Sequence, residues 1–253
     1  MKDSLSHQLQ KLVKGSAVIN TPKHALEALF ETVFITLFKQ STFMMAFSDG
    51  YLRSNPEFAT RNFYCQRDLK NLKACVNTYL NMILDAQPFD DVLGGEYDQY
   101  LGFDLGQFFT PPDVASLMAE LHIQSVDYQS HITSNMPISL SDLCCGGGAL
   151  TMGMLRSLYQ EHGKRAIALV DIHAVDLDPH MCRLTALQVI LSSMLHQVPF
   201  SSLRVDCGNP LIQSEKLFVY AIPQVQKYFN NHMPNELDWY EYSRQIELQK
   251  KVA

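Results

Sequence analysis

The sequence lacks a hydrophobic run long enough to cross a membrane. A spanning helix needs about 20 consecutive apolar residues. The longest apolar stretch, residues 25–47, is interrupted by the polar side chains of Glu27, Glu31, Lys39 and Gln40, among others. The first residues, Met1-Lys2-Asp3-Ser4, are polar and show no secretory signal. We therefore expect no association with a membrane and a cytoplasmic location.

The cysteines lack the spacing of a metal site. The chain has 6 cysteines, and no two of them form a Cys-x-x-Cys pair. Structural zinc sites are usually built from such pairs. Buried, reduced thiols are the ordinary state of cysteines in the cytoplasm, so we predict no bound metal.

An excess of positive charge is also absent. The 20 Lys and Arg residues and 26 Asp and Glu residues give a formal net charge of −6 at pH 7. Bulk attraction to nucleic acid is therefore not predicted, and no dedicated DNA-binding module is evident. The length of 253 residues and the hydrophobic fraction of 47% are typical of one large or two small globular domains.

The patterns that are present divide the chain near residue 105. Apolar residues before this point recur at helical spacing and predict helices over residues 3–14, 22–47, 56–83 and 91–103. Two of these helices begin with an N-cap residue followed by proline, at Thr21 and at Asn55. We predict a helical N-terminal region over residues 1–105 and a second domain over residues 106–253.

Strands and helices alternate after residue 105. A helix capped at Thr110 is followed by a polar linker over residues 124–135, and strands are predicted over residues 138–143, 168–176, 203–207 and 218–222. This alternation predicts an α/β fold with a parallel sheet and helices on both faces. Residues after 222 show no strand alternation, so we expect a shortened sheet.

A glycine-rich turn, Asp142-Leu143-Cys144-Cys145-Gly146-Gly147-Gly148, joins the first of these strands to a helix. Glycines permit a sharp turn and a close approach of a ligand to the backbone. The start of the helix carries partial positive charge that favours anionic groups. Because the full Gly-x-Gly-x-x-Gly fingerprint is absent, a nucleotide-like cofactor and an ordinary glycine turn both fit the pattern.

Polar residues also follow the next two strands. Asp176 ends the second strand, where an acidic side chain can accept hydrogen bonds from both hydroxyls of a ribose. Asp178 is a nearby competitor, and Asp176 equally fits an N-cap ahead of Pro179. Asn209 follows the third strand and could reach a nucleoside base or belong to a Gly-Asn-Pro turn.

One further string makes the resemblance to a known family specific. Gly106-Gln107-Phe108-Phe109-Thr110-Pro111, which could also be a hydrophobic staple at a helix start, precedes the glycine turn and Val175-Asp176-Leu177-Asp178-Pro179. In this order, over about residues 90–211, the strings resemble the adenine-specific (N-6) DNA methyltransferases, in particular the modification subunits of type I restriction-modification systems. The resemblance implies a Rossmann-like class I methyltransferase sheet, here shortened, with S-adenosylmethionine as cofactor.

The resemblance also implies roles for residues. Those that would contact the cofactor are Phe108, Phe109, Thr110 and Pro111 at its methionine end, Asp142, Cys144, Gly146 and Gly148 at its centre, Asp176 and its neighbour Leu177 at the ribose, and Asn209 at the adenine. At this last position the family usually has an acidic residue.

The catalytic string of the family, Asn/Asp-Pro-Pro-Phe/Tyr after the fourth strand, does not occur. In the family it orients the target amine and stacks on the flipped base. Pro223, at the end of the predicted fourth strand, and Asn209 are the positional counterparts. We therefore expect one of two functions. The first is a DNA adenine methyltransferase of restriction-modification type, acting on DNA through a partner specificity subunit or an oligomer. The second is an inactive cofactor-binding protein with a regulatory, assembly or anti-restriction role.

Overall fold

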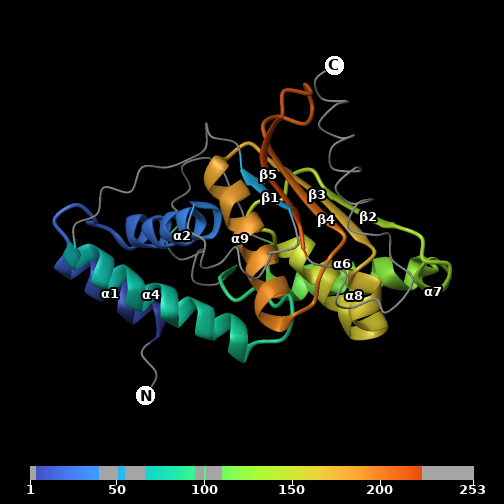
Figure 1. The fold of residues 1–253 in the computed structure, drawn as a ribbon, viewed down its shortest axis with the longest axis horizontal. Coiled ribbons are helices and arrows are strands. Elements are labelled where there is room, and N and C mark those ends of the chain that lie inside the picture. The colour runs from blue at the N-terminus through green and yellow to red at the C-terminus, as the bar shows by residue number, and fades with distance from the viewer. Residues whose placement is uncertain (1–3, 40–50, 55–65, 95–99, 101–109, 224–253) are drawn as a thin grey trace.

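The computed structural model describes residues 4–39, 51–54, 66–94, 100 and 110–223. Five strands of this part form one sheet in the order β1-β5-β4-β3-β2 (Figure 1). The strands are β1 (Tyr51–Ser54), β2 (Ile138–Asp142), β3 (Val170–Asp176), β4 (Ser202–Cys207) and β5 (Lys216–Ile222). The helices are α1 (Leu5–Gly15), α2 (Pro22–Lys39), α4 (Gln66–Asp85), α6 (Pro112–Ser125), α7 (Tyr128–Thr133), α8 (Ala149–Ile167) and α9 (Pro179–His196).

Strands β2, β3 and β4 confirm the predicted parallel core of the sheet. Ile138 lies opposite Val170 in the β2–β3 pair, and Ile172 lies opposite Leu203 in the β3–β4 pair. Helix α8 connects β2 to β3, and α9 connects β3 to β4. A helical connection between two parallel strands of one sheet is right-handed. The connections from β2 to β3 and from β3 to β4 step along the sheet in the same direction, so α8 and α9 lie on the same face.

Strand β5 corrects the prediction of an all-parallel sheet. It occurs where the sequence predicts it, but it runs antiparallel to β4 and to β1. Residues 208–215 join β4 to β5, and a connection this short makes a hairpin, because a parallel crossover needs a dozen or more residues. The four-residue strand β1 is too short to show alternation and was not predicted.

The two faces of the sheet differ in polarity. One face carries Ile138, Ile172 and Leu203, which are buried. On the other face, Ser139 and Ser141 are exposed, and the side chains of His173 and Arg204 are 40% and 46% exposed. In the described part of the chain, α8 and α9 therefore cover one face of β2–β4, whereas the sequence predicted helices on both.

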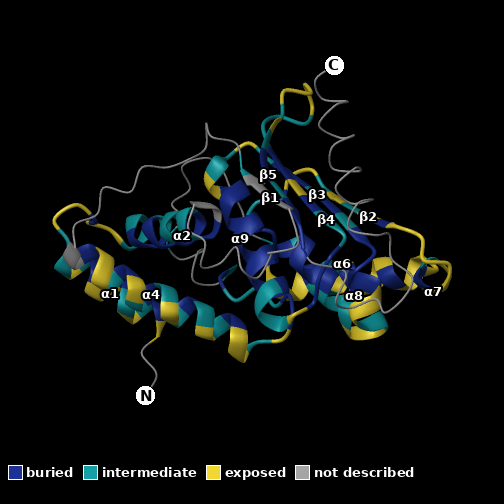
Figure 2. Ribbon diagram, viewed as in Figure 1, coloured by how far each residue is buried: buried dark blue, intermediate teal, exposed yellow. Residues whose placement is uncertain are grey.

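The N-terminal helices pack on the α/β part through α9. Figure 1 shows α9 between α4 and the strands, and α2 and α4 both contact it. Figure 2 shows α9 largely buried, while α1 and α4 each keep an exposed side. The ring centroids of Phe34 in α2 and Phe218 in β5 are 5.6 Å apart, and the backbone N–H of Phe89 donates to Ser192 Oγ at 2.7 Å.

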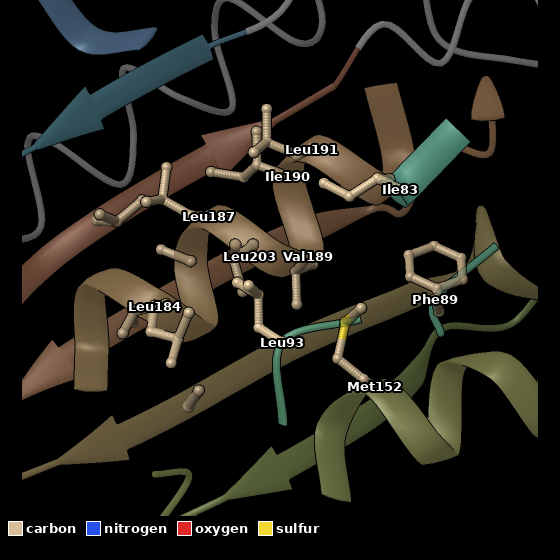
Figure 3. Close-up of a cluster of buried hydrophobic side chains, with 14 of the residues drawn as sticks. Ile83, Phe89, Leu93, Met152, Leu184, Leu187, Val189, Ile190, Leu191 and Leu203 are labelled. Carbon is tan, nitrogen blue, oxygen red and sulfur yellow. The ribbon is translucent and has the colours of Figure 1, made fainter. Parts of the chain in front are cut away.

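One hydrophobic core thus spans both predicted regions. Figure 3 shows Ile83, Phe89 and Leu93, from the first 105 residues, beside side chains of α8, α9 and β4. The predicted boundary near residue 105 lies among residues outside the described part, and the division into domains stays a prediction.

The helix boundaries agree with the sequence pattern in most places. Helix α1 matches the predicted helix, and α2 begins at Pro22 as expected. Helix α6 begins at Pro112, but its N-cap is Pro111 without a side-chain hydrogen bond, so Thr110 does not cap it. Helix α7 interrupts the predicted polar linker. The predicted helix over 91–103 falls mostly outside the described residues, and no described helix is long and apolar enough to span a membrane.

Candidate functional site

The carboxyl ends of β2, β3 and β4 meet at one edge of the sheet. Asp142 ends β2 and lies opposite Ala174, while Asp176 ends β3 and lies opposite Cys207 of β4. Parallel strands bring the polar residues that follow them to the same edge, where open α/β sheets bind ligands. The structure therefore brings together Asp142, the glycine turn and Asp176, as the sequence predicts.

The glycine turn is held against the end of β3. Cys145 N donates to Val175 O at 2.9 Å, and Gly148 N donates to Cys145 O at 2.8 Å. Gly146 and Gly148 have φ angles of 51° and 93°, which residues with a side chain adopt only with strain. A Cβ built on Gly148 would lie 3.1 Å from Thr185 Oγ1, so this position is also sterically tight.

Two polar side chains of α9 hold the turn from its other side. Thr185 Oγ1 donates to Gly146 O at 2.8 Å, and Gln188 Nε2 donates to Gly147 O at 2.8 Å. Both side chains are almost fully buried. The sequence analysis did not single out these residues, although polar residues three apart within the apolar run of α9 were a signal that could have found them.

Asp176 connects the turn to the end of β3. Its Oδ2 accepts a hydrogen bond from Gly146 N, and its Oδ1 accepts one from Asp178 N, both at 2.9 Å. Asp178 is the N-cap of α9 and accepts from His180 N at 2.8 Å. Asp178 therefore caps α9, and the alternative role of Asp176 as a helix cap is wrong. Each carboxylate oxygen of Asp176 keeps a further lone pair that can accept a hydroxyl hydrogen.

Asp142 lies behind the turn in a more buried position. Its Oδ2 accepts a hydrogen bond from Thr151 Oγ1 of α8 at 2.8 Å. Burial raises the pKa of the Asp142 carboxyl, and the nearby charge of Asp176 adds to this, while the hydrogen bonds from Thr151 and Cys144 oppose it. Two carboxylates at the same edge thus have different surroundings.

The remaining predicted cofactor residues are described only in part. Thr110 is half-buried, while Pro111, Cys144 and Leu177 are exposed. Phe108 and Phe109 lie outside the described residues, so their predicted contact with the cofactor stays a prediction. The contacts of Thr110, Pro111, Cys144 and Leu177 with a cofactor likewise stay predictions.

Asn209 organises the hairpin between β4 and β5. Its Oδ1 accepts a hydrogen bond from Leu211 N at 2.9 Å, and its backbone O accepts from Ser214 N at 3.3 Å. The side chain therefore forms the turn that the sequence offered as one alternative. It follows β4 at the same edge as Asp176, since Gly208 N donates to Asp176 O at 2.9 Å.

Pro223 is not brought to this edge. In the antiparallel β4–β5 pair, Lys216 lies opposite Cys207 near the carboxyl ends, whereas Ala221 lies opposite Leu203 near the start of β4. The chain therefore leaves β5 at the opposite edge of the sheet, and Pro223 is buried there. Pro223, which the sequence offers as a positional counterpart of the catalytic string, therefore lies away from Asp142 and Asp176.

The arrangement fits a nucleoside cofactor at three points. A Cβ at Gly146 would meet nothing within 4 Å, so the turn is open on that side. Gly148 caps α8 without a side-chain hydrogen bond, which leaves the positive end of the helix to a ligand. Asp176 offers carboxylate oxygens beside both features. No group of three metal-binding side chains occurs within the described ranges.

A comparison of the chain with protein families identifies the family to which it belongs. No curated protein matches the chain. The family model described as N-6 DNA methylase matches residues 91–241, which is more than half of the chain and includes β2 to β5 with the glycine turn. The chain belongs to the N-6 DNA methylase family.

Proposed function

We propose that this protein binds S-adenosylmethionine at the carboxyl edge of β2–β4 and contributes the cofactor half of a DNA adenine methyltransferase of restriction-modification type. One observation carries the proposal. The turn that follows β2 is linked to the acidic residue that ends β3, because Gly146 N donates to Asp176 Oδ2. A rigid turn beside an acidic residue is the arrangement that open α/β sheets use for adenosine-containing ligands.

In this proposal each group of the chain has a defined task. Asp176 accepts hydrogen bonds from the ribose hydroxyls, and the backbone of residues 144–148 lies along the centre of the ligand. Thr185 and Gln188 fix the carbonyls of the turn, so that its shape does not change on binding. S-adenosylmethionine, when bound, supplies a methyl group on a positively charged sulfur, and the exocyclic amine of adenine is the expected acceptor.

Cofactor binding is tested by calorimetry with S-adenosylmethionine. We expect one site per chain, and we expect Asp176→Asn to weaken binding by about 10- to 100-fold, because hydrogen bonds to charged groups contribute about 1.5–3 kcal/mol. Asp178→Asn is the matched control, since asparagine is also a good N-cap. No binding by the wild-type chain, or equal losses in both variants, would contradict the proposed site.

A second candidate function is a cofactor-binding protein that does not catalyse methyl transfer. The direction of β5 favours it, because Pro223 lies away from Asp142 and Asp176. Transfer of labelled methyl groups to adenine-containing DNA, measured for the chain alone and together with a partner polypeptide, separates the two functions, because only a methyltransferase subunit gains activity with the partner. We expect the isolated chain to bind the cofactor and transfer no label, and transfer by the chain alone would show that it contains its own catalytic groups.

A further inference from the structure

The described sheet contains one half of a doubly wound arrangement. Such sheets have the strand order 3-2-1-4-5-6, and the ligand crevice lies where the order reverses, beside the first strand. Here β2, β3 and β4 are the first, second and third strands, and β2 is the last strand in the sheet order. The position that the fourth strand takes in a doubly wound sheet is the outer edge of β2.

The backbone of β2 offers hydrogen-bonding groups at this edge. Ile138 N donates to Leu169 O, on the side of β3. Backbone direction alternates along a strand, so the N–H and C=O groups of Ser139 and Ser141 point away from β3. Both residues are exposed. An edge of this kind can accept an added strand.

The helix layer extends past the sheet at the same edge. Helix α9 packs on β3, β4 and β5, α8 packs on β2 and β3, and the main packing partner of α6 among the described elements is α8. Helix α6 contacts α8 closely, since a Cβ on Gly153 would lie 3.1 Å from Ala115 O. Each helix in this series lies further along the sheet than the one before, so α6 lies beyond β2.

The side of α6 that faces away from α8 is apolar and exposed. Its buried residues are Ala115, Ala119 and Ile123. A second set at helical spacing is exposed by 42 to 60%: Val114, Leu117, Met118 and Leu121. Four large apolar side chains in one exposed row mark an interaction surface rather than ordinary surface variation. We call these four residues and the outer edge of β2 the β2–α6 surface.

A second copy of this chain is a poor occupant of the β2–α6 surface. Antiparallel pairing of two β2 strands about a two-fold axis would place both overhanging α6 helices, each about 10 Å wide, above the same seam. Helix α6 also contains two carboxylates, Asp113 and Glu120, and no lysine or arginine. Two such helices would repel each other, whereas a partner with basic residues beside its apolar side chains would complement them.

We propose that a different polypeptide adds a β-strand to the outer edge of β2 and packs apolar side chains of that strand against the exposed row of α6. The space under one helix accommodates about two strands at about 4.8 Å spacing. The carboxyl end of a parallel strand in this position would lie beside Asp142 and the glycine turn. That strand would therefore supply the hydrogen-bond acceptor for the target amine, and this part of the inference rests on the proposed function.

Photo-crosslinking in the native host tests the occupant directly. Benzoylphenylalanine is placed at Leu117 in one full-length variant and at Ser139 in another. Leu84 of α4 is the control, because it is an apolar side chain that is 50% exposed, close to the 56% of Leu117. We expect the first two variants, and not the third, to crosslink to neighbouring residues of one other polypeptide. Adducts between two copies, adducts within the same chain, or no adducts would overturn the proposal.

Reconstitution with the purified crosslinked polypeptide gives the quantitative test. We expect a 1:1 complex by light scattering, and we expect Leu117→Glu to weaken it by about tenfold or more. Ser139→Pro removes an outward N–H of β2 and should also weaken it, whereas Ser139→Ala should not. Both weakening variants should keep the wild-type affinity for S-adenosylmethionine. Wild-type affinity for the partner in both would overturn the docking.

The complex also separates the docking from the catalytic function. Methyl transfer by the complex and not by either chain alone supports both proposals. A stable complex that transfers no methyl group leaves the docking supported and overturns the proposal that the partner's strand completes an active methyltransferase.

Discussion

At the scale of single residues, the two aspartates of the candidate site have different roles. Asp176 lies half-buried with backbone N–H groups on both oxygens. Asp142 receives a hydrogen bond from Thr151 but has a raised pKa, first because of burial and then because of the charge of Asp176. Keeping Asp142 ionised therefore lowers the stability of the fold, as is common where a site is built for a ligand.

The raised pKa of Asp142 predicts how the stability of the Asp142→Asn variant depends on pH. Because the pKa of Asp142 is higher in the folded chain than in the unfolded chain, the folded state gains stability from this group as the pH falls, and loses it as the pH rises above the raised pKa. Asparagine can still accept from Thr151 and does not ionise. We expect the variant to melt at a higher temperature than wild type at pH 7, with a smaller difference at pH 4.

Thermal melting from pH 4 to pH 8 measures this effect, with Asp171→Asn of β3 as the control. Asp171 accepts a hydrogen bond from Ser202 at 2.7 Å and lies at the other end of the strand. A difference between Asp142→Asn and wild type that does not depend on pH would contradict the assigned cause.

At the scale of elements, the hairpin from β4 to β5 determines which edge the later chain reaches. Gly208 has a φ of 154°, and a Cβ at this position would lie 2.6 Å from Glu215 Cα and 2.7 Å from Ser214 O. These are backbone atoms and cannot move aside as a flexible side chain can. The reversal of the chain therefore depends on glycine at this position.

We expect Gly208→Ala to lower the free energy of unfolding by about 2 kcal/mol, through steric conflict in the hairpin. Urea denaturation followed by circular dichroism measures the loss. Gly146→Ala is the comparison, because its φ of 51° imposes strain but nothing lies within 4 Å of the added carbon; we expect about 1 kcal/mol there. Equal losses would mean that the backbone contact at Gly208 carries no cost.

At the scale of the whole molecule, the N-terminal helices and the sheet share one core. Phe34 is 2% exposed and packs on Phe218 of β5, and the guanidinium of Arg183 from α9 lies 5.5 Å from its ring centroid. Helices α2 and α4 both cover α9, whose opposite side packs on the strands. The edge that carries Asp142 and Asp176 is therefore supported by residues from both halves of the sequence.

We expect Phe34→Ala to destabilise the whole described structure by about 3 kcal/mol, as large core truncations do. The unfolding should remain a single transition. Hydrogen exchange at increasing urea, read by mass spectrometry, should show α4, α9 and β3 losing protection together. Loss of protection in α4 well before β3 would instead support two independently folding regions.

The predictable part of the fold lies where the pattern is local. Strands β2, β3 and β4 were predictable because apolar residues, turn residues and helix caps adjoin them in the chain. Their parallel pairing followed from the helices between them. The closeness of Asp142, Gly146 and Asp176 was predictable for the same reason, because the carboxyl ends of parallel strands lie at one edge of the sheet. The hydrogen-bond partners of Thr185 and Gln188 escaped prediction, because the carbonyls of Gly146 and Gly147 lie about 40 residues away in the sequence.

The sequence by itself determined the α/β core, the glycine turn and its place beside Asp176, since strand periodicity, glycine and proline act within a few residues. Only the tertiary structure decided the direction of β5, the place of β2 at the end of the described sheet and the exposed row on α6. These depend on which strand pairs with which, and on which helix faces are left uncovered after packing. Pairing and coverage are properties of the folded chain and cannot be read from patterns within a few residues.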